Sequence, residues 1–216
     1  MIHMDNVSYS FQKGAGVENI NLELADGEFV YLIGPTGSGK TTLLRLIYMD
    51  LLPQVGSLQV NKFNSLKIKK RKIPFLRRTI GMVFQDYNLL NDRNLFENVA
   101  LPLHVTGFAR EEIEDRVNDA LGMVGLEGKE SYNPRELSGG EQQRACVARA
   151  IVKEPDIILA DEPTGNLDPL TAFELIKLFE EINREGTTVL MASHNYNIIK
   201  GRGRRIIEIQ DGKLRQ

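Results

Sequence analysis

A glycine-rich stretch at residues 34–42 constrains this chain more than any other feature, because of what flanks it. An apolar run at residues 29–33 precedes it and predicts a buried strand, and residues 43–47 have the pattern of a helix. The stretch fits the phosphate-loop pattern G-x-x-x-x-G-K-[ST], and it consists of Gly34, Pro35, Thr36, Gly37, Ser38, Gly39, Lys40, Thr41 and Thr42. A turn that merely caps a helix is the alternative, but the strand-to-helix context favours nucleotide phosphate binding.

This loop has the chemistry that a triphosphate needs. Its glycines let successive backbone N–H groups turn toward phosphate oxygens, and the following helix adds the positive end of its dipole. We expect Lys40 to contact the β- and γ-phosphates and Thr41 to ligate Mg²⁺. The sequence therefore predicts a nucleotide site that holds Mg²⁺.

Composition narrows the class of protein. A chain of 216 residues can bury a full core, so we expect a single domain over residues 1–216. A net charge of −2 gives no general attraction for nucleic acid. The only cysteine, Cys146, excludes an internal disulfide and is typical of a reducing cytosol, where it would be a small buried side chain. With no apolar run near the roughly 18 residues that cross a bilayer and no secretory signal, we expect a soluble protein whose membrane role depends on a partner.

Strands and helices alternate along the chain, which predicts an α/β fold. Besides residues 29–33, apolar strand patterns lie at residues 80–84, 156–160 and 187–192. Each leads to a polar residue at its end. This arrangement indicates a mainly parallel sheet with its site at the carboxyl edge.

Two further regions are predicted beside this core. Residues 2–11 and 17–24 alternate apolar and polar side chains around a glycine-rich break, which predicts an N-terminal antiparallel hairpin. Residues 86–153 predict a helical subdomain, because residues 110–126 have the pattern of an amphipathic helix.

Polar side chains that follow the core strands are candidates for catalysis. Asp161 ends one strand, which matches the Walker B role of holding Mg²⁺, and Glu162 can accept a proton from an attacking water. The alternative, two solvated carboxylates, conflicts with the buried strand that leads to them. Gln85 can reach a metal or a water, although surface glutamines are common. His194 is either structural or in reach of a γ-phosphate and the attacking water.

Two more signals leave alternatives open. Ser138 and Glu141 form a capping box that predicts a helix start, and Gly139 and Gly140 follow the cap although glycine is a poor helix former. The glycines indicate either close approach to an anion or an ordinary capped helix. Phe11, ahead of the phosphate loop, either stacks on adenine or belongs to the core.

Residues 67–78 hold seven basic side chains and no acidic one. Such a run usually forms a solvated face, but it can also meet anionic lipid headgroups or an acidic partner surface. That it lies toward a membrane is a hypothesis.

Taken in order, these motifs resemble the ATP-binding subunits of ABC transporters over essentially the whole chain. The matching positions are Walker A at residues 34–42, the Q-loop Gln85, the signature at residues 137–143, Walker B at Asp161 and Glu162, the D-loop at residues 166–168 and the switch His194. The resemblance implies an ABC-type P-loop ATPase that hydrolyses ATP with Mg²⁺.

The resemblance also implies roles that spacing does not supply. Phe11 would be the aromatic residue under adenine, and Asp168 would belong to the nucleotide site. Ser138, Gly139 and Gly140 would cap the γ-phosphate held by the other copy in a head-to-tail homodimer that forms on ATP binding. Gln85 would ligate Mg²⁺, sense the attacking water and border the groove for a membrane partner. Lys40, Gln85, Glu162 and His194 would form the catalytic set, with Thr41, Gln85 and Asp161 at the metal.

Within that superfamily, residues 73–86 and the following Asn88, Leu89 and Leu90 are similar to the FtsE family of cell-division ATPases. Members work with the integral membrane protein FtsX to relay ATP-driven shape change to cell-wall hydrolases. The resemblance implies a cytoplasmic protein, peripheral at the inner face of the cell membrane, with an FtsX-type partner and no nucleic acid.

Other functions share parts of this pattern. The ATPases of lipoprotein-release and macrolide exporters have most of the other motifs. An ATP-dependent regulator or nucleic-acid machine without a membrane partner is a third possibility, against which the mildly acidic charge and the single nucleotide domain argue. Asn195 departs from the family, because many members have an acid after the switch histidine.

Overall fold

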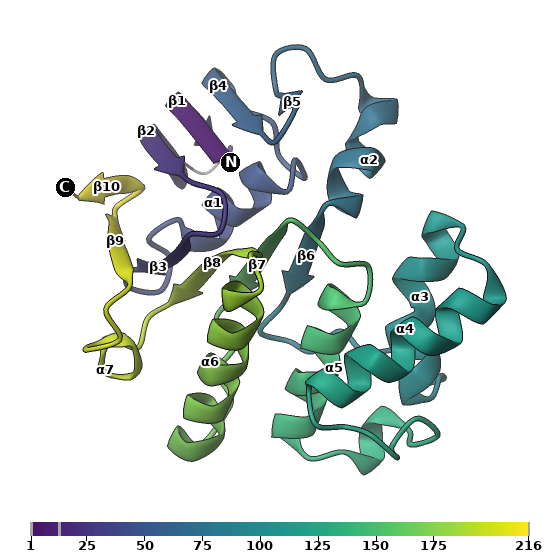
Figure 1. Ribbon diagram of the computed structural model, residues 1–216. Helices are drawn as coiled ribbons and strands as arrows, with labels where there is room; N and C mark the ends of the chain where they lie inside the picture. Colours follow the sequence, from purple (N-terminus) through teal and green to yellow (C-terminus); the bar gives the residue numbers. More distant parts are fainter. Residues whose placement is uncertain (1, 13, 216) are drawn as a thin grey trace.

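The computed structural model describes residues 2–12 and 14–215 (Figure 1). Along the chain the elements are β1 (Ile2–Ser10), β2 (Gly16–Leu24), β3 (Phe29–Ile33), α1 (Lys40–Ile47), β4 (Val55–Val60), β5 (Phe63–Asn64), η1 (Lys70–Lys72), α2 (Ile73–Arg78), β6 (Ile80–Val83), α3 (Leu95–Thr106), α4 (Arg110–Met123), η2 (Pro134–Glu136), α5 (Gly139–Ile151), β7 (Ile157–Asp161), α6 (Pro169–Arg184), β8 (Thr188–Ser193), α7 (Tyr196–Ile199), β9 (Arg205–Gln210) and β10 (Lys213–Arg215).

These strands form two sheets. The larger has the order β10-β9-β3-β8-β7-β6, and all of its neighbouring pairs are parallel except β10 with β9. The smaller is antiparallel, with the order β2-β1-β4-β5, so the predicted N-terminal hairpin is present and gains two strands. The prediction of an α/β fold with a mainly parallel sheet and an antiparallel N-terminal region is confirmed.

The main sheet is covered on both faces. Val30 and Leu32 pack in a cluster with α1 and the antiparallel sheet, whereas Phe29 and Tyr31 belong to a second cluster with the helices of the opposite face. All four side chains are buried. A strand buried on both faces has no polar side to expose, which explains why residues 29–33 read as an unbroken apolar run.

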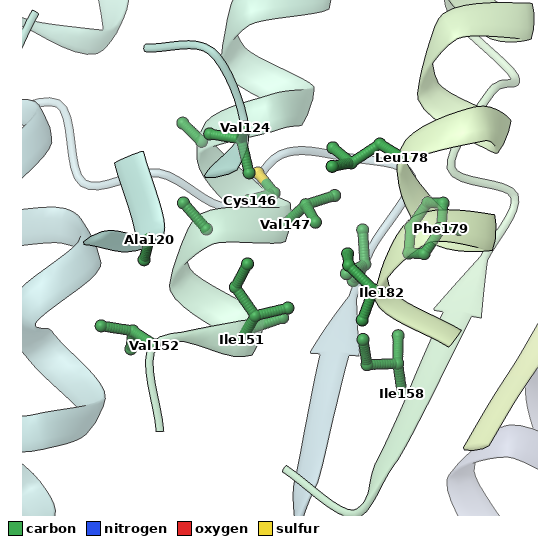
Figure 2. Close-up of a cluster of buried hydrophobic side chains, with 14 of the residues drawn as sticks. Ala120, Val124, Cys146, Val147, Ile151, Val152, Ile158, Leu178, Phe179 and Ile182 are labelled. Carbon is green, nitrogen blue, oxygen red and sulfur yellow. The ribbon is translucent and has the colours of Figure 1, made fainter. Parts of the chain in front are cut away.

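The second cluster joins α4, α5 and α6 to the sheet (Figure 2). Its side chains include Ala120, Val124, Cys146, Val147, Ile151, Val152, Ile158, Leu178, Phe179 and Ile182. Cys146 is 1% exposed, as expected for a small apolar side chain. Among the described residues, none of the helices combines the length and apolar character needed to span a bilayer.

Some predicted boundaries were wrong by one or two residues. β6 ends at Val83 rather than Phe84, which lies outside the strand and is 39% exposed. The pattern of apolar side chains at residues 175, 178, 179 and 182 predicts a helix from Thr171 to Arg184, but α6 begins at Pro169, because Asp168 caps its N-terminus and proline is well suited to the first helical position. The helices α3, α4 and α5 lie within residues 86–153, where the sequence predicted a helical subdomain.

Candidate nucleotide site

One cavity gathers residues that the sequence had predicted from separate motifs. It has a volume of about 400 Å³ and lies at the carboxyl edge of the main sheet. Its lining residues are Ala15, Gly16, Thr36, Gly37, Gly39, Lys40, Thr41, Thr42, Gln85, Glu162 and His194. Ala15 and Gly16 come from the turn before β2 and the start of β2. The other lining residues follow the carboxyl ends of β3, β6, β7 and β8, because parallel strands place these ends at the same edge of the sheet.

The glycine-rich loop has little freedom in its backbone. Gly39, the N-cap of α1, has a φ of 112°, which a residue with a side chain rarely adopts. A Cβ on Gly34 would lie 2.2 Å from the carbonyl oxygen of Ile209. The amide of Gly212 donates to the Ser38 carbonyl at 3.0 Å, so the β9–β10 turn supports the loop. The Ser38 hydroxyl is buried without a hydrogen-bond partner among the described residues.

Lys40 lies across this loop and is 5% exposed. Its Nζ donates to the carbonyl oxygens of Gly34 at 2.7 Å and Pro35 at 3.1 Å. It also lies 3.2 Å from Glu162 Oε1. A nearly buried ammonium group with an anionic partner is held as a fixed positive charge at the cavity wall.

Glu162 is positioned by an unusual backbone conformation. Its φ of 50° is in the left-handed region, and its amide donates to the Ala192 carbonyl at 3.0 Å. Its carboxylate Oε2 accepts from the backbone N–H of His194 at 3.1 Å and lies 2.8 Å from His194 Nδ1. Because an ionised carboxylate can only accept, this contact assigns the ring hydrogen of a neutral His194 to Nδ1. Glu162 therefore joins Lys40 to His194.

Asp161 ends β7 next to the loop. Burial raises the pKa of its carboxyl group, a hydrogen bond from Thr41 lowers it, and the charge of Glu162 raises it further. Its Oδ1 is buried and has no hydrogen-bond partner among the described residues. An unpaired carboxylate oxygen beside a threonine hydroxyl is the kind of oxygen pair that Mg²⁺ prefers.

Gln85 lines the same cavity from an irregular segment between β6 and α3. Helix α5 holds the neighbouring backbone: Arg149 donates to the carbonyl oxygens of Tyr87 at 2.9 Å and Asn88 at 2.6 Å. The Cys146 thiol donates to the Tyr87 carbonyl at 2.9 Å. Sequence reasoning did not find Arg149, since an arginine on an amphipathic helix carries no local signal of a carbonyl partner 61 residues away.

Ser138, Gly139 and Gly140 do not line this cavity. Ser138 caps α5, and Glu141 Oε2 accepts from the Ser138 N–H at 2.8 Å and from its hydroxyl at 2.6 Å. A Cβ on Gly140 would lie 2.6 Å from Thr171 Cγ2. Close packing against α6 thus gives a reason for glycine at this position that the sequence pattern did not reveal.

Phe11 and Asp168 also lie outside the cavity lining. Phe11 packs edge-on against Tyr9, with 4.9 Å between ring centroids. Tyr9, not Phe11, lines an adjoining cavity of about 590 Å³ that shares Ala15, Gly16 and Gly37 with the first. Hydrogen bonds from Thr171 lower the pKa of Asp168, whose carboxylate also accepts from the Leu170 N–H at 3.0 Å.

Comparison with known proteins agrees with this geometry. The profile of the ABC transporter family matches residues 17–165. The cell division ATP-binding protein FtsE of Streptococcus pneumoniae strain D39 is 45% identical over 215 residues, which cover 99% of this chain and 94% of that protein. FtsE of Escherichia coli K12 is 44% identical over 215 residues, with 99% and 97% covered.

Solved structures of ABC cassettes are similar as well. The dimeric structure of the bacterial ABC transporter cassette MJ0796 has a TM-score of 0.90 and 36% identity, and covers 100% of this chain and 97% of its own. Its post-hydrolysis dimer, bound to ADP and Pi, has a TM-score of 0.90 and 35% identity, with the same coverage. Because it is similar to FtsE proteins over nearly its full length, and because its phosphate loop and the ends of its parallel strands meet at one cavity, this chain belongs to the ABC transporter family, as an ATP-hydrolysing subunit of the FtsE cell-division type.

Proposed function

We propose that the cavity binds the triphosphate of ATP and that its residues have separate roles in hydrolysis. The observation that carries this proposal is the connected set Lys40, Glu162 and His194 at the mouth of the glycine-rich loop. Lys40 and the loop amides of residues 34–42 bind the phosphates, since both are fixed donors in a confined space. Adenine stacking on Phe11 is part of the proposal, although Tyr9 is the aromatic side chain that lines the adjoining cavity.

Glu162 is proposed as the group that accepts the proton of the attacking water. Water attacks the γ-phosphorus, the bond from that phosphorus to the β–γ bridging oxygen breaks, and ADP and phosphate result. Lys40 and His194 hold the two carboxylate oxygens of Glu162, so the side chain keeps one orientation. Gln85, at the same wall, orients the water.

We further propose Mg²⁺ as the metal, with Thr41, Gln85 and Asp161 as its protein ligands. The fit rests on the unpaired Asp161 Oδ1. Among the described residues no three His, Cys, Asp or Glu side chains gather as a metal cage. That agrees with Mg²⁺, which is bound by one or two carboxylates together with phosphate oxygens and water. When bound there, Mg²⁺ supplies positive charge to the β- and γ-phosphate oxygens.

The position of Ser138 outside the cavity supports a homodimer. A capped helix start has free N–H groups that favour an anion, and here these groups do not line the cavity of their own chain. We propose that two copies close head to tail on ATP, each placing Ser138, Gly139 and Gly140 on the γ-phosphate of the other, and that Asp168 also belongs to the nucleotide site. MJ0796 cassettes form dimers.

We also propose that the dimer drives an integral membrane protein of FtsX type and thereby regulates cell-wall hydrolysis, with the ATPase peripheral at the inner face of the cell membrane. The identity to FtsE proteins supports this. Co-purification from detergent-solubilised membranes should recover such a protein, identified by mass spectrometry. Recovery of a lipoprotein-release or macrolide-export protein instead would contradict the assignment.

Replacement of the proposed base tests the chemistry. We expect Glu162→Gln to retain ATP binding and to form a stable dimer with Mg-ATP, while turnover falls by about 10²-fold or more, because binding stays and the proton acceptor is gone. ATPase assays and size-exclusion chromatography with light scattering measure both effects.

Glu174→Gln is the matched control, since Glu174 is exposed on α6. The control should behave as the parent in both assays. Parental turnover in Glu162→Gln would show that the base is another residue.

A further inference from the structure

The distribution of charge on this chain is uneven. Residues 62–85 carry eight of the 27 Lys and Arg side chains and none of the 29 Asp and Glu, so the rest of the chain has a net charge of −10 against −2 for the whole. Most of this positive charge lies in residues 67–78, here called the basic arm, which comprise the loop after β5, η1 and α2 (Figure 1). The basic arm is therefore a positively charged segment of a chain that is otherwise negatively charged.

The base of the arm is fixed to the core. Leu76 is fully buried, and Arg77 donates to the carbonyl oxygens of Tyr48 at 3.3 Å and Met49 at 3.1 Å. Lys153 donates to the Arg77 carbonyl at 2.6 Å. Arg77 is thus a structural residue, and these contacts determine which face of α2 points outward.

The outward face carries cations that have no carboxylate partner among the described residues. The side chains concerned are exposed, and they are those of Lys67, Lys69, Lys70, Arg71, Lys72 and Arg78. Within the described part of the chain, none of the six lies within 4.0 Å of a carboxylate. Their charges are available to an external anion.

An exposed aromatic ring lies among these cations. Lys72, Phe75 and Arg78 are spaced by three along the η1–α2 segment and share one face. Lys72 Nζ and the Arg78 guanidinium carbon each lie 4.9 Å from the Phe75 ring centroid, and the ring is 47% exposed. Leu66, just before the arm, is 72% exposed. Apolar side chains with cations beside them are typical of segments that lie in the headgroup region of a bilayer.

From these features we infer that the basic arm binds the anionic headgroups of a membrane surface directly, with Phe75 and Leu66 entering the boundary between headgroups and acyl chains. A nucleic acid fits less well, because a long polyanion would extend over the acidic remainder of the chain, whereas a membrane plane meets only the arm. No residue of the arm lines either cavity described above, so a small anion would find no enclosure there.

The position of the arm is compatible with nucleotide binding. Helix α2 leads into the start of β6, and the cavity lies where β6 and its parallel neighbours end. The arm is therefore at the opposite edge of the sheet. Contact with a membrane leaves the nucleotide cavity open, and this inference needs neither the proposed FtsX-type partner nor ATP hydrolysis.

Vesicle flotation tests the inference with the full chain. The probes are phosphatidylcholine vesicles with about one third phosphatidylglycerol and vesicles of phosphatidylcholine alone. We expect binding to the anionic vesicles only, weakening as salt rises from about 50 mM to about 500 mM. Charge reversal of Lys69, Lys70 and Arg71 to Glu should weaken this binding by at least about tenfold, because each basic residue contributes separately to attraction to the surface.

The matched control reverses Lys177, Arg184 and Lys200 to Glu, the same change in charge at exposed positions outside the arm. It should bind vesicles as the parent does, and both triple variants should keep parental ATPase activity, which confirms that they fold. Phe75→Ser should weaken binding by about threefold through loss of the apolar contact.

Two results would overturn the inference. In the first, the control and the arm variant lose vesicle binding equally. The loss would then reflect the change in net charge and not the position of the basic arm. The other result combines two observations: the parent does not bind anionic vesicles, and charge reversal of the arm abolishes capture of a solubilised membrane protein. The arm would then be a site for an acidic protein surface.

Discussion

At Asp161, burial raises the pKa of the carboxyl group, and Oδ1 has no hydrogen-bond partner among the described residues. A folded-state pKa above the unfolded value means that the folded protein binds the proton more tightly. The ionised form therefore destabilises the fold at neutral pH, and this penalty disappears as the pH falls below the unfolded pKa. A carboxylate kept at such a position is expected to have a function, which here is the proposed Mg²⁺ site.

We predict that Asp161→Asn raises the urea midpoint of unfolding at pH 7, since it removes a buried charge, and lowers ATPase activity by about 10²-fold. The Mg²⁺ concentration for half-maximal activity should rise. Urea denaturation and an ATPase titration with MgCl₂ check both. An unchanged Mg²⁺ requirement would remove Asp161 from the metal site, and a lower urea midpoint would contradict the account of its burial.

Among the helices, α5 connects two parts of the proposed mechanism. Its first turn contains the Ser138 cap, and Arg149 in its last turn holds the segment that follows Gln85. A shift of α5 therefore displaces the signature residues and the Q-loop segment together. The stability of its first turn depends on Glu141, which bonds Ser138 and pairs with Lys129.

These contacts make the stability of the first turn of α5 depend on pH. Hydrogen bonds from Lys129 and Ser138 lower the pKa of Glu141 from 4.5 to about 2. A lowered folded-state pKa stabilises the fold above the unfolded value, and this contribution is lost as the pH falls from about 4.5 toward 2. We predict that Glu141→Gln destabilises the protein at pH 7 by about 1 kcal/mol and that the difference narrows over this range. Urea denaturation at several pH values measures it.

Glu97→Gln provides the control for that prediction. Glu97 forms the equivalent capping box with Asn94 at the start of α3, and within the described residues it has no ion-pair partner. Its substitution should have a smaller effect at pH 7. Equal effects of the two substitutions would mean that Lys129 contributes nothing to the cap.

For the whole molecule, Ser138 lies outside the cavity of its own chain, so the proposed head-to-tail dimer requires residues of both copies at each site. A symmetric dimer would contain two such shared sites. We predict that Lys40→Ala and Ser138→Arg are each inactive alone, but that their mixture regains up to about one quarter of parental ATPase activity, because half of the dimers are mixed and each has one intact site.

The mixture is measured against each variant alone at the same total concentration. A mixture of Lys40→Ala and Glu162→Gln is the control, because both changes lie on the same side of the site and no mixed dimer restores a complete one. Activity in the control, or none in the first mixture, would contradict the shared site.

Local sequence was enough to predict much of the fold and to name candidate site residues, whose roles remain predictions. The strand at residues 29–33, the phosphate loop and the Ser138 cap depend on near neighbours in the chain, since side-chain alternation, glycine conformations and capping hydrogen bonds all act over a few residues. The end of β6 and the start of α6 were less predictable. Phe84 continues the apolar run but lies outside the sheet. Asp168 was assigned to the D-loop motif, so its role as the N-cap of α6 was not predicted.

What the sequence determined by itself was therefore the class of fold, the order of its motifs and the chemistry that each motif can perform. Only the tertiary structure decided which of them meet: Lys40, Glu162 and His194 make contact, Ser138 and Phe11 lie outside their cavity, and Thr171 approaches Gly140. The physical reason is range. Propensity and periodicity act within one element, whereas a contact between residues in different elements, such as Glu162 and His194, which are 32 positions apart, exists only after strand order and helix packing have brought them together.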